Sequence, residues 1–105
     1  MAEKHELIVV IGNEGFSDVI MAAAREAGAR GGTITHARGT GTSEMERKYG
    51  IFITPQKEMT FIVVNVKIRD QVMAAINKVA GIDTRVSAIT ISLPISNVVG
   101  LKFEV

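Results

Sequence analysis

Two apolar stretches, each followed by an amphipathic stretch that ends in a glycine, organise the chain. Residues 7–11 precede an amphipathic stretch over 19–28, and residues 60–64 precede a similar stretch over 72–81. Each copy continues from its glycine into a second β-like run. The pattern therefore predicts an internal repeat in which each half folds as strand, helix, strand.

The first amphipathic stretch has its apolar residues three and four apart, which is the spacing of one helix face. Ser17 is the predicted N-cap, because a serine hydroxyl accepts a hydrogen bond from the free amides of the first turn. Gly28 suits the left-handed position that ends many helices. The predicted apolar stripe comprises Ile20, Ala23, Ala24 and Ala27.

The second amphipathic stretch predicts another helix, which Gly81 ends. Residues 65–69 offer no strong N-cap, so the sequence leaves the first residue of this helix open. Its apolar stripe comprises Val72, Ile76 and Val79, flanked by Met73 and Ala80.

The second strand of each half is predicted from alternation of apolar and polar residues. Residues 33–36 alternate weakly and residues 87–93 more clearly. Two βαβ units in tandem predict an α+β, ferredoxin-like βαββαβ sandwich, an antiparallel sheet with two helices on one face. At 105 residues the chain has the length of one domain, so residues 1–105 are taken as a single domain.

Both faces of the two central strands are apolar. Leu7, Val9 and Ile11 alternate with Ile8 and Val10, and on the third strand Phe61 and Val63 alternate with Ile62, Val64 and Val66. Helices would cover only one face of the sheet, and an open apolar face of this size marks an interface. We therefore expect a closed homo-oligomer that buries the helix-free face. The alternative is that these residues reflect only the ordinary composition of central strands.

Charge is nearly balanced along the chain, with 12 basic and 11 acidic residues. This balance gives no long-range field to attract nucleic acid or an anionic membrane, so neither is an expected partner. The absence of cysteine excludes disulfides and thiolate metal sites. Residues 1–6 are charged where a signal peptide would turn apolar, and no apolar run reaches the roughly 20 residues of a membrane span. A cytoplasmic protein without membrane insertion is predicted.

Glycine is concentrated in residues 28–42, which hold five of the ten glycines. Glycines let a backbone approach an anion closely, and free amides beside Arg and Thr side chains form phosphate-binding nests. The segment around residues 38–42 is therefore the candidate ligand loop. The alternative is structural: Gly31 and Gly32 shape the entry to the second strand, and Gly39 and Gly41 shape its exit.

Residues 40–56 show no periodicity and form a connection longer than a hairpin turn. Long connections in compact domains are often functional, so this segment is a candidate contact loop for a partner protein. It also fits a short helical turn over residues 44–49, capped by Thr42 or Ser43 and anchored by residues 51–53. The two interpretations are compatible.

With its Gly-Ala-Arg-Gly-Gly-Thr-Ile-Thr-His-Ala-Arg-Gly-Thr-Gly run (residues 28–41) between the two helices, the chain resembles the nitrogen-regulatory PII signal-transduction family. The resemblance extends from Leu7 to about Leu101 and identifies the chain as a divergent, PII-like member. It implies a ferredoxin-like homotrimer whose intersubunit clefts bind an adenine nucleotide, ATP, ADP or AMP, or a related small anion. It also implies that the 40–56 loop controls a partner, a membrane transporter or a metabolic enzyme.

The resemblance also implies roles for particular residues. The family's second phosphate loop is replaced here by residues 80–86, where Arg85 is a substitute charge, and the basic pair of the C-terminal strand is missing, with only Lys102 following. The partner loop would present Glu44, Glu46, Arg47, Lys48 and Tyr49. The implied nucleotide-binding residues are Gly31, Thr33, Arg38, Gly39, Gly41, Val63, Arg85 and Lys102.

Enzyme activity is not expected. The chain has only two histidines, His5 and His36, no cysteine, and scattered carboxylates that form no acid–base pair or metal-ligand spacing. His36 alternates with Ile34 and is predicted to lie on the intersubunit face. The competing interpretation is a trimeric ferredoxin-like module for metal tolerance or structural assembly, which binds no nucleotide and needs no cofactor.

Overall fold

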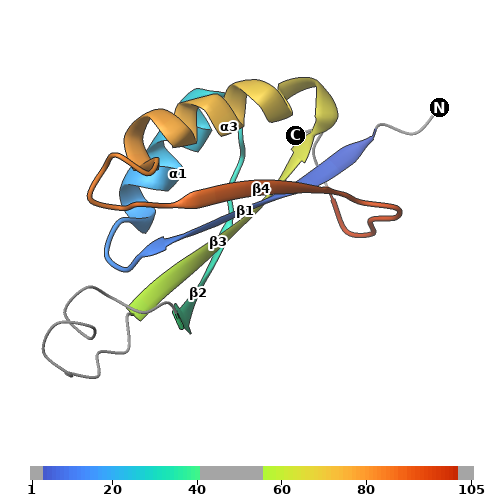
Figure 1. Cartoon of the computed structure of the whole chain (residues 1–105). Helices are drawn as coiled ribbons and strands as arrows, with labels where there is room; N and C mark the ends of the chain where they lie inside the picture. Colours follow the sequence, from blue (N-terminus) through green and yellow to red (C-terminus); the bar gives the residue numbers. More distant parts are fainter. Residues whose placement is uncertain (1–3, 41–55, 102–105) are drawn as a thin grey trace, which may run out of the picture.

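Four strands and two helices make up the part of the chain that the computed structural model describes, residues 4–40 and 56–101. Figure 1 shows the sheet with both helices above it. In chain order the elements are β1 (His5–Asn13), α1 (Ser17–Glu26), β2 (Thr33–Arg38), β3 (Gln56–Asn65), α3 (Val66–Ala80) and β4 (Ile89–Pro94).

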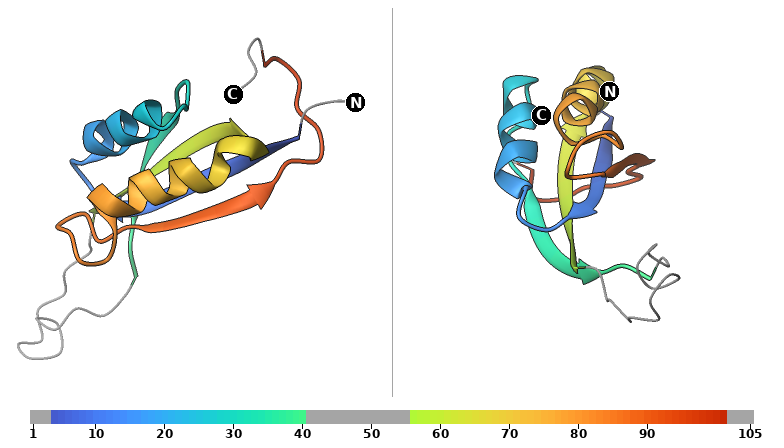
Figure 2. Two further views of the ribbon diagram at one scale, coloured as in Figure 1. Left: turned by 90° about the horizontal axis from the view of Figure 1, so that it is seen from above. Right: turned by 60° about the vertical axis from the view of Figure 1, so that its left-hand side comes forward.

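The strands form one sheet in the order β2-β3-β1-β4, in which every neighbouring pair is antiparallel. Each half of the repeat therefore places its two strands on either side of a strand from the other half, which is the split βαβ arrangement. Both helices lie on the same side of the sheet (Figure 2). The predicted ferredoxin-like fold is confirmed.

The core lies between the helices and one face of the two central strands. Ile8 on β1 stands opposite Ile62 on β3, and both side chains are fully buried. Residues two apart on a strand share a face, so Val10 and Val64 join them. The helices bury their apolar stripes against this layer of strand residues. The buried helix residues are Ile20, Met21, Ala24, Val72, Ile76 and Ala80.

The opposite face of the sheet carries no helix and is apolar, as the sequence predicts. Val9 pairs with Phe61 on one side and with Ile91 on the other, and all three point away from the helices. Val9 lies in the middle of the sheet and is only 5% exposed, whereas Ile91 is 42% exposed and Ile89 61%. A large apolar surface is thus left open by the single chain.

The helix starts differ from the sequence-based expectation. Ser17 is not the N-cap of α1: it is the first helical residue, and the cap position is Phe16, which has no side-chain capping hydrogen bond. Helix α3 does have a side-chain cap, because Asn65 Oδ1 accepts a hydrogen bond from the Lys67 amide at 2.9 Å. The prediction that residues 65–69 offer no strong N-cap is therefore wrong. Gly28 follows α1 with a φ of +116°, as predicted.

Two strands also have different bounds from those predicted. β3 begins at Gln56, several residues earlier than its apolar run, because its polar first half pairs with β2 and with the end of β1. It ends at Asn65, and Val66, which was predicted on this strand, is the first residue of α3 because Asn65 caps the helix there. β4 begins at Ile89 and not at residue 87, because Ser87 has a φ of +49° and belongs to a turn.

Helix α3 is also tied to β1 by charge. Arg69 donates from Nη1 to both oxygens of Glu6, at 3.0 and 2.9 Å, and from Nε to Asp70 at 2.9 Å. The hydrogen bond to Asp70, followed by that to Glu6, raises the pKa of the Arg69 guanidinium above its ordinary value.

Within the described residues, neither helix has the length and apolar composition to cross a bilayer.

Candidate ligand-binding site

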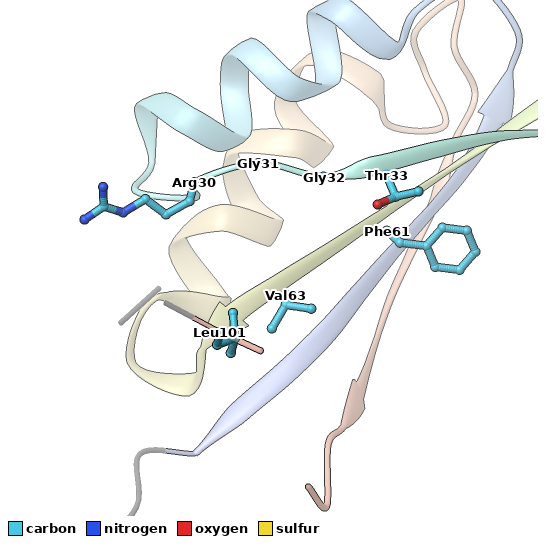
Figure 3. A pocket seen from close by; sticks show the side chains of 7 residues that line it. All are labelled: Arg30, Gly31, Gly32, Thr33, Phe61, Val63 and Leu101. Atoms are coloured by element: carbon cyan, nitrogen blue, oxygen red, sulfur yellow. The ribbon is translucent and has the colours of Figure 1, made fainter. Parts of the chain in front are cut away.

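A pocket of about 240 Å³ lies where the segment between α1 and β2 passes over β3. Its floor is apolar and its rim carries glycines, a threonine hydroxyl and an arginine (Figure 3). The volume is below the roughly 300–1,000 Å³ that is typical of small-molecule sites. The lining residues are Arg30, Gly31, Gly32, Thr33, Phe61, Val63 and Leu101.

The two adjacent glycines of the rim differ in how closely other atoms surround them. A Cβ on Gly32 would lie 2.9 Å from Met21 Sδ and 3.0 Å from the Phe61 carbonyl oxygen, so the fold itself requires glycine there. A Cβ on Gly31 would meet no atom within 4 Å, and Gly31 does not have a left-handed φ. Nothing inside the described chain requires glycine at Gly31.

Three of the residues implied for nucleotide binding, Gly31, Thr33 and Val63, line this pocket together. β2 begins at Thr33, which pairs with Phe61, so the edge of β3 beside Val63 extends past the first residue of β2. The sequence-based prediction did not include Arg30, Gly32, Phe61 and Leu101. Phe61 could have been found, because it lies two residues before Val63 on the same face of an alternating strand.

Arg38 and Gly39 lie at the other end of β2 from this pocket. Arg38 ends the strand opposite Gln56, five residues beyond Thr33, or about 16 Å along an extended strand. Arg85 belongs to the same end of the sheet, because its carbonyl accepts a hydrogen bond from Asn13 Nδ2 at 3.0 Å and Asn13 is the last residue of β1. The implied binding residues that the structure describes thus form two groups, which lie at opposite ends of the sheet.

The remaining residues of the prediction lie outside the described part of the chain. They are Gly41 and Lys102 of the implied nucleotide site, and Glu44, Glu46, Arg47, Lys48 and Tyr49 of the implied partner loop.

His36 lies near the Arg38 end, on the side of the sheet that carries the helices. This follows from its pairing with Glu58, since Thr60, two residues on, pairs with buried Val10. The prediction that His36 lies on the helix-free face is therefore wrong. Its Nδ1 is 3.9 Å from a carboxylate oxygen of Glu14 and 3.9 Å from one of Glu58. Glu58 also accepts a hydrogen bond from the Gly15 amide at 3.0 Å.

Metal coordination finds no support in residues 4–40 and 56–101. No group of three or more His, Cys, Asp or Glu side chains in those ranges is placed to hold a metal ion.

The fold is shared with solved structures of low sequence identity. The chain is similar to a GlnK–ATP complex from B. subtilis, with 18% identity, a TM-score of 0.73, and coverage of 94% of this chain and 88% of that chain. It is also similar to B. subtilis GlnK, with 15% identity, a TM-score of 0.71 and coverage of 96% and 93%. A third similar structure is Arabidopsis thaliana PII bound to citrate, with 22% identity, a TM-score of 0.71 and coverage of 95% and 85%.

Sequence comparison identifies the family. No curated protein sequence matches the chain. The family model described as "Nitrogen regulatory protein P-II" matches residues 5–102, which include every strand and helix described above. The chain therefore belongs to the nitrogen regulatory protein P-II family.

Proposed function

We propose that the chain is a regulatory protein, not an enzyme, that binds an adenine nucleotide or a related small anion between copies of itself. The copies assemble as a trimer through the helix-free face, and each cleft joins the Gly31 end of one copy to the Arg38 end of the next. Through residues 40–56 the protein then controls a partner, a transporter or a metabolic enzyme.

The observation that carries the proposal is the pocket at Gly31. Gly31 has open space around it and an ordinary backbone conformation, yet it lines a pocket with an apolar floor. No described residue accounts for glycine there, whereas a ligand or a second copy beside this pocket would. Phe61, Val63 and Leu101 would offer a base an apolar surface, and the Thr33 hydroxyl would offer a polar contact at the rim.

Assembly is supported by what the single chain leaves incomplete. The two groups of implied binding residues are too far apart to contact one small ligand, but a closed ring of copies can bring the end of one chain to the other end of its neighbour. The helix-free face also leaves Ile89, Ile91 and Leu93 of β4 exposed in the single chain, and a second copy would cover them.

The similar structures support the ligand class. One is a GlnK–ATP complex and another is a PII protein bound to citrate, so a nucleotide and a small polyanion each bind to relatives with this fold.

Calorimetric titration with ATP, ADP and AMP tests the proposal. At least one nucleotide is expected to bind the purified protein. Gly31→Ala is expected to weaken that binding by roughly tenfold, because its methyl group enters the pocket, and to leave the unfolding midpoint unchanged. Arg38→Ala is expected to weaken binding by about ten- to a hundredfold through loss of a charged hydrogen bond to phosphate.

Arg25→Ala is the matched control for Arg38→Ala, because Arg25 is an exposed arginine in the last turn of α1. It is expected to bind the nucleotide as the unmodified protein does. Absence of binding heat with all three nucleotides would rule out the nucleotide function, and unchanged affinity in both Gly31→Ala and Arg38→Ala would place the site elsewhere.

A further inference from the structure

Asn13, the last residue of β1, links β3 to the connection between α3 and β4, residues 81–88. Its side-chain oxygen Oδ1 accepts a hydrogen bond from Lys57 Nζ at 2.7 Å, and its Nδ2 donates to the Arg85 carbonyl at 3.0 Å. Its backbone amide donates to the Val86 carbonyl at 2.9 Å. One residue of β1 therefore holds two successive carbonyl groups of the connection.

Lys57 determines which way the Asn13 side-chain amide faces. A lysine ammonium has three N–H donors and no acceptor, so the Asn13 atom beside it must be the oxygen. Nδ2 then faces the other way, where the Arg85 carbonyl accepts its hydrogen bond. Lys57 and Asn13 are also paired in the register of β3 and β1, so the sheet keeps the two residues opposite each other. Together they present a donor of fixed direction to Arg85.

The peptide group between Arg85 and Val86 is held from both sides. Its carbonyl accepts from Asn13 Nδ2 at 3.0 Å, and its N–H donates to Thr84 Oγ1 at the longer distance of 3.3 Å. Val86 is itself packed closely, because its side chain is 2% exposed and a Cβ on Gly12 would lie 2.8 Å from its Cγ1. With Val86 fixed, the orientation of this planar peptide group sets the ψ angle of Arg85 and hence where its side chain leaves the backbone.

Arg85 is exposed, in contrast to the buried valine that follows it. An exposed arginine loses side-chain freedom when it binds an anion, and a backbone that is already oriented reduces what must be ordered on binding. The hydrogen bond from Asn13 therefore affects how well Arg85 can contact a ligand, although Asn13 itself need not touch the ligand.

We propose that Asn13 is a positioning residue for ligand binding, which acts on an anionic group of the ligand through Arg85. This inference rests on the proposed function, with Arg85 at the Arg38 end of the cleft, and adds to it the residue that orients Arg85. Lys57 is part of the same arrangement, because it fixes the direction of the Asn13 amide.

A double-mutant cycle tests this inference, by calorimetric titration of the full chain with whichever of ATP, ADP and AMP binds most tightly. Arg85→Ala is expected to weaken binding by about tenfold, through loss of a charged hydrogen bond. Asn13→Ala is expected to weaken it by roughly two- to tenfold, the equivalent of one hydrogen bond. When Arg85→Ala is already present, Asn13→Ala is expected to weaken binding no further, because its effect passes through Arg85.

Asn97→Ala is the matched control, because Asn97 is an exposed asparagine in the segment after β4. It is expected to bind the nucleotide as the unmodified protein does. Asn13→Ala keeps the backbone hydrogen bond to Val86, so circular dichroism should show that it remains folded.

Three results would overturn the inference and leave the proposed function intact. They are unchanged affinity in Arg85→Ala, unchanged affinity in Asn13→Ala, and an equal loss from Asn13→Ala with and without Arg85→Ala, which a general structural effect would produce. Failure of all three nucleotides to bind the unmodified protein would instead defeat the proposed function, and this inference with it.

Discussion

Ile91→Glu is expected to convert the proposed trimer into monomers. Ile91 lies on β4, pairs with Val9 in the middle of the helix-free face, and is 42% exposed in the single chain. Burial of this face between copies would enclose a carboxylate with no partner, at a cost of several kcal/mol for each copy. A threefold assembly would enclose three such groups, so the trimer should be lost at micromolar concentration in analytical ultracentrifugation.

Ile82→Glu is the matched control for this change. Ile82 is also an exposed isoleucine, 76% exposed, but it lies in the turn after α3 and not on the sheet. This variant is expected to sediment as a trimer. If the unmodified protein itself sediments as a monomer, or if Ile91→Glu remains a trimer, the helix-free face is not the interface. Circular dichroism should show that both variants remain folded.

Ile62→Ala is expected to destabilise the fold by about 2–5 kcal/mol, the usual cost of removing three carbons from a filled core. Ile62 is fully buried, stands opposite Ile8 and packs in the layer beneath the helices. A small domain has only about 5–15 kcal/mol of stability in total, so much of it would be lost. Urea unfolding at one fixed protein concentration measures the change, because assembly adds to apparent stability.

Two further variants set the scale of that measurement. Ile62→Val removes one carbon at the same place and is expected to cost about 0.5–1.5 kcal/mol. Ile82→Ala makes the identical chemical change at an exposed residue and is expected to stay within about 0.5 kcal/mol of the unmodified protein. Equal destabilisation by Ile62→Ala and Ile82→Ala would contradict the core described for this fold.

The sequence predicted the fold because strands that are apolar on both faces, and helices with one apolar stripe, leave a clear pattern. The alternation of Ile8 and Val10 with Leu7 and Val9 follows from one face packing on helices and the other being apolar without them. A helix cap made by one side-chain atom and a turn made by one backbone angle leave no such pattern in the sequence. Asn65 caps α3 through a single oxygen, and Ser87 ends a turn through its backbone conformation.

The candidate site was predictable in part. The resemblance to the PII family implied Gly31 and Thr33, which line the pocket. Glycine content alone does not separate Gly32, which the packing against Met21 requires, from Gly31, which no described neighbour constrains. The position of His36 depends on strand register. A shift by one residue exchanges the faces of a strand, so weak alternation in residues 33–36 could not decide the face.

The separation of the two groups of binding residues along β2 has a genetic consequence. Under the proposed trimer, Arg38 and Gly31 of one subunit serve different clefts. A Gly31→Ala subunit still offers an intact Arg38 end, and an Arg38→Ala subunit still offers an intact Gly31 end. Mixed trimers of these two defective chains would therefore regain a complete cleft at one of their junctions. Two inactive alleles expressed together would complement each other, whereas a chain carrying both substitutions would rescue neither.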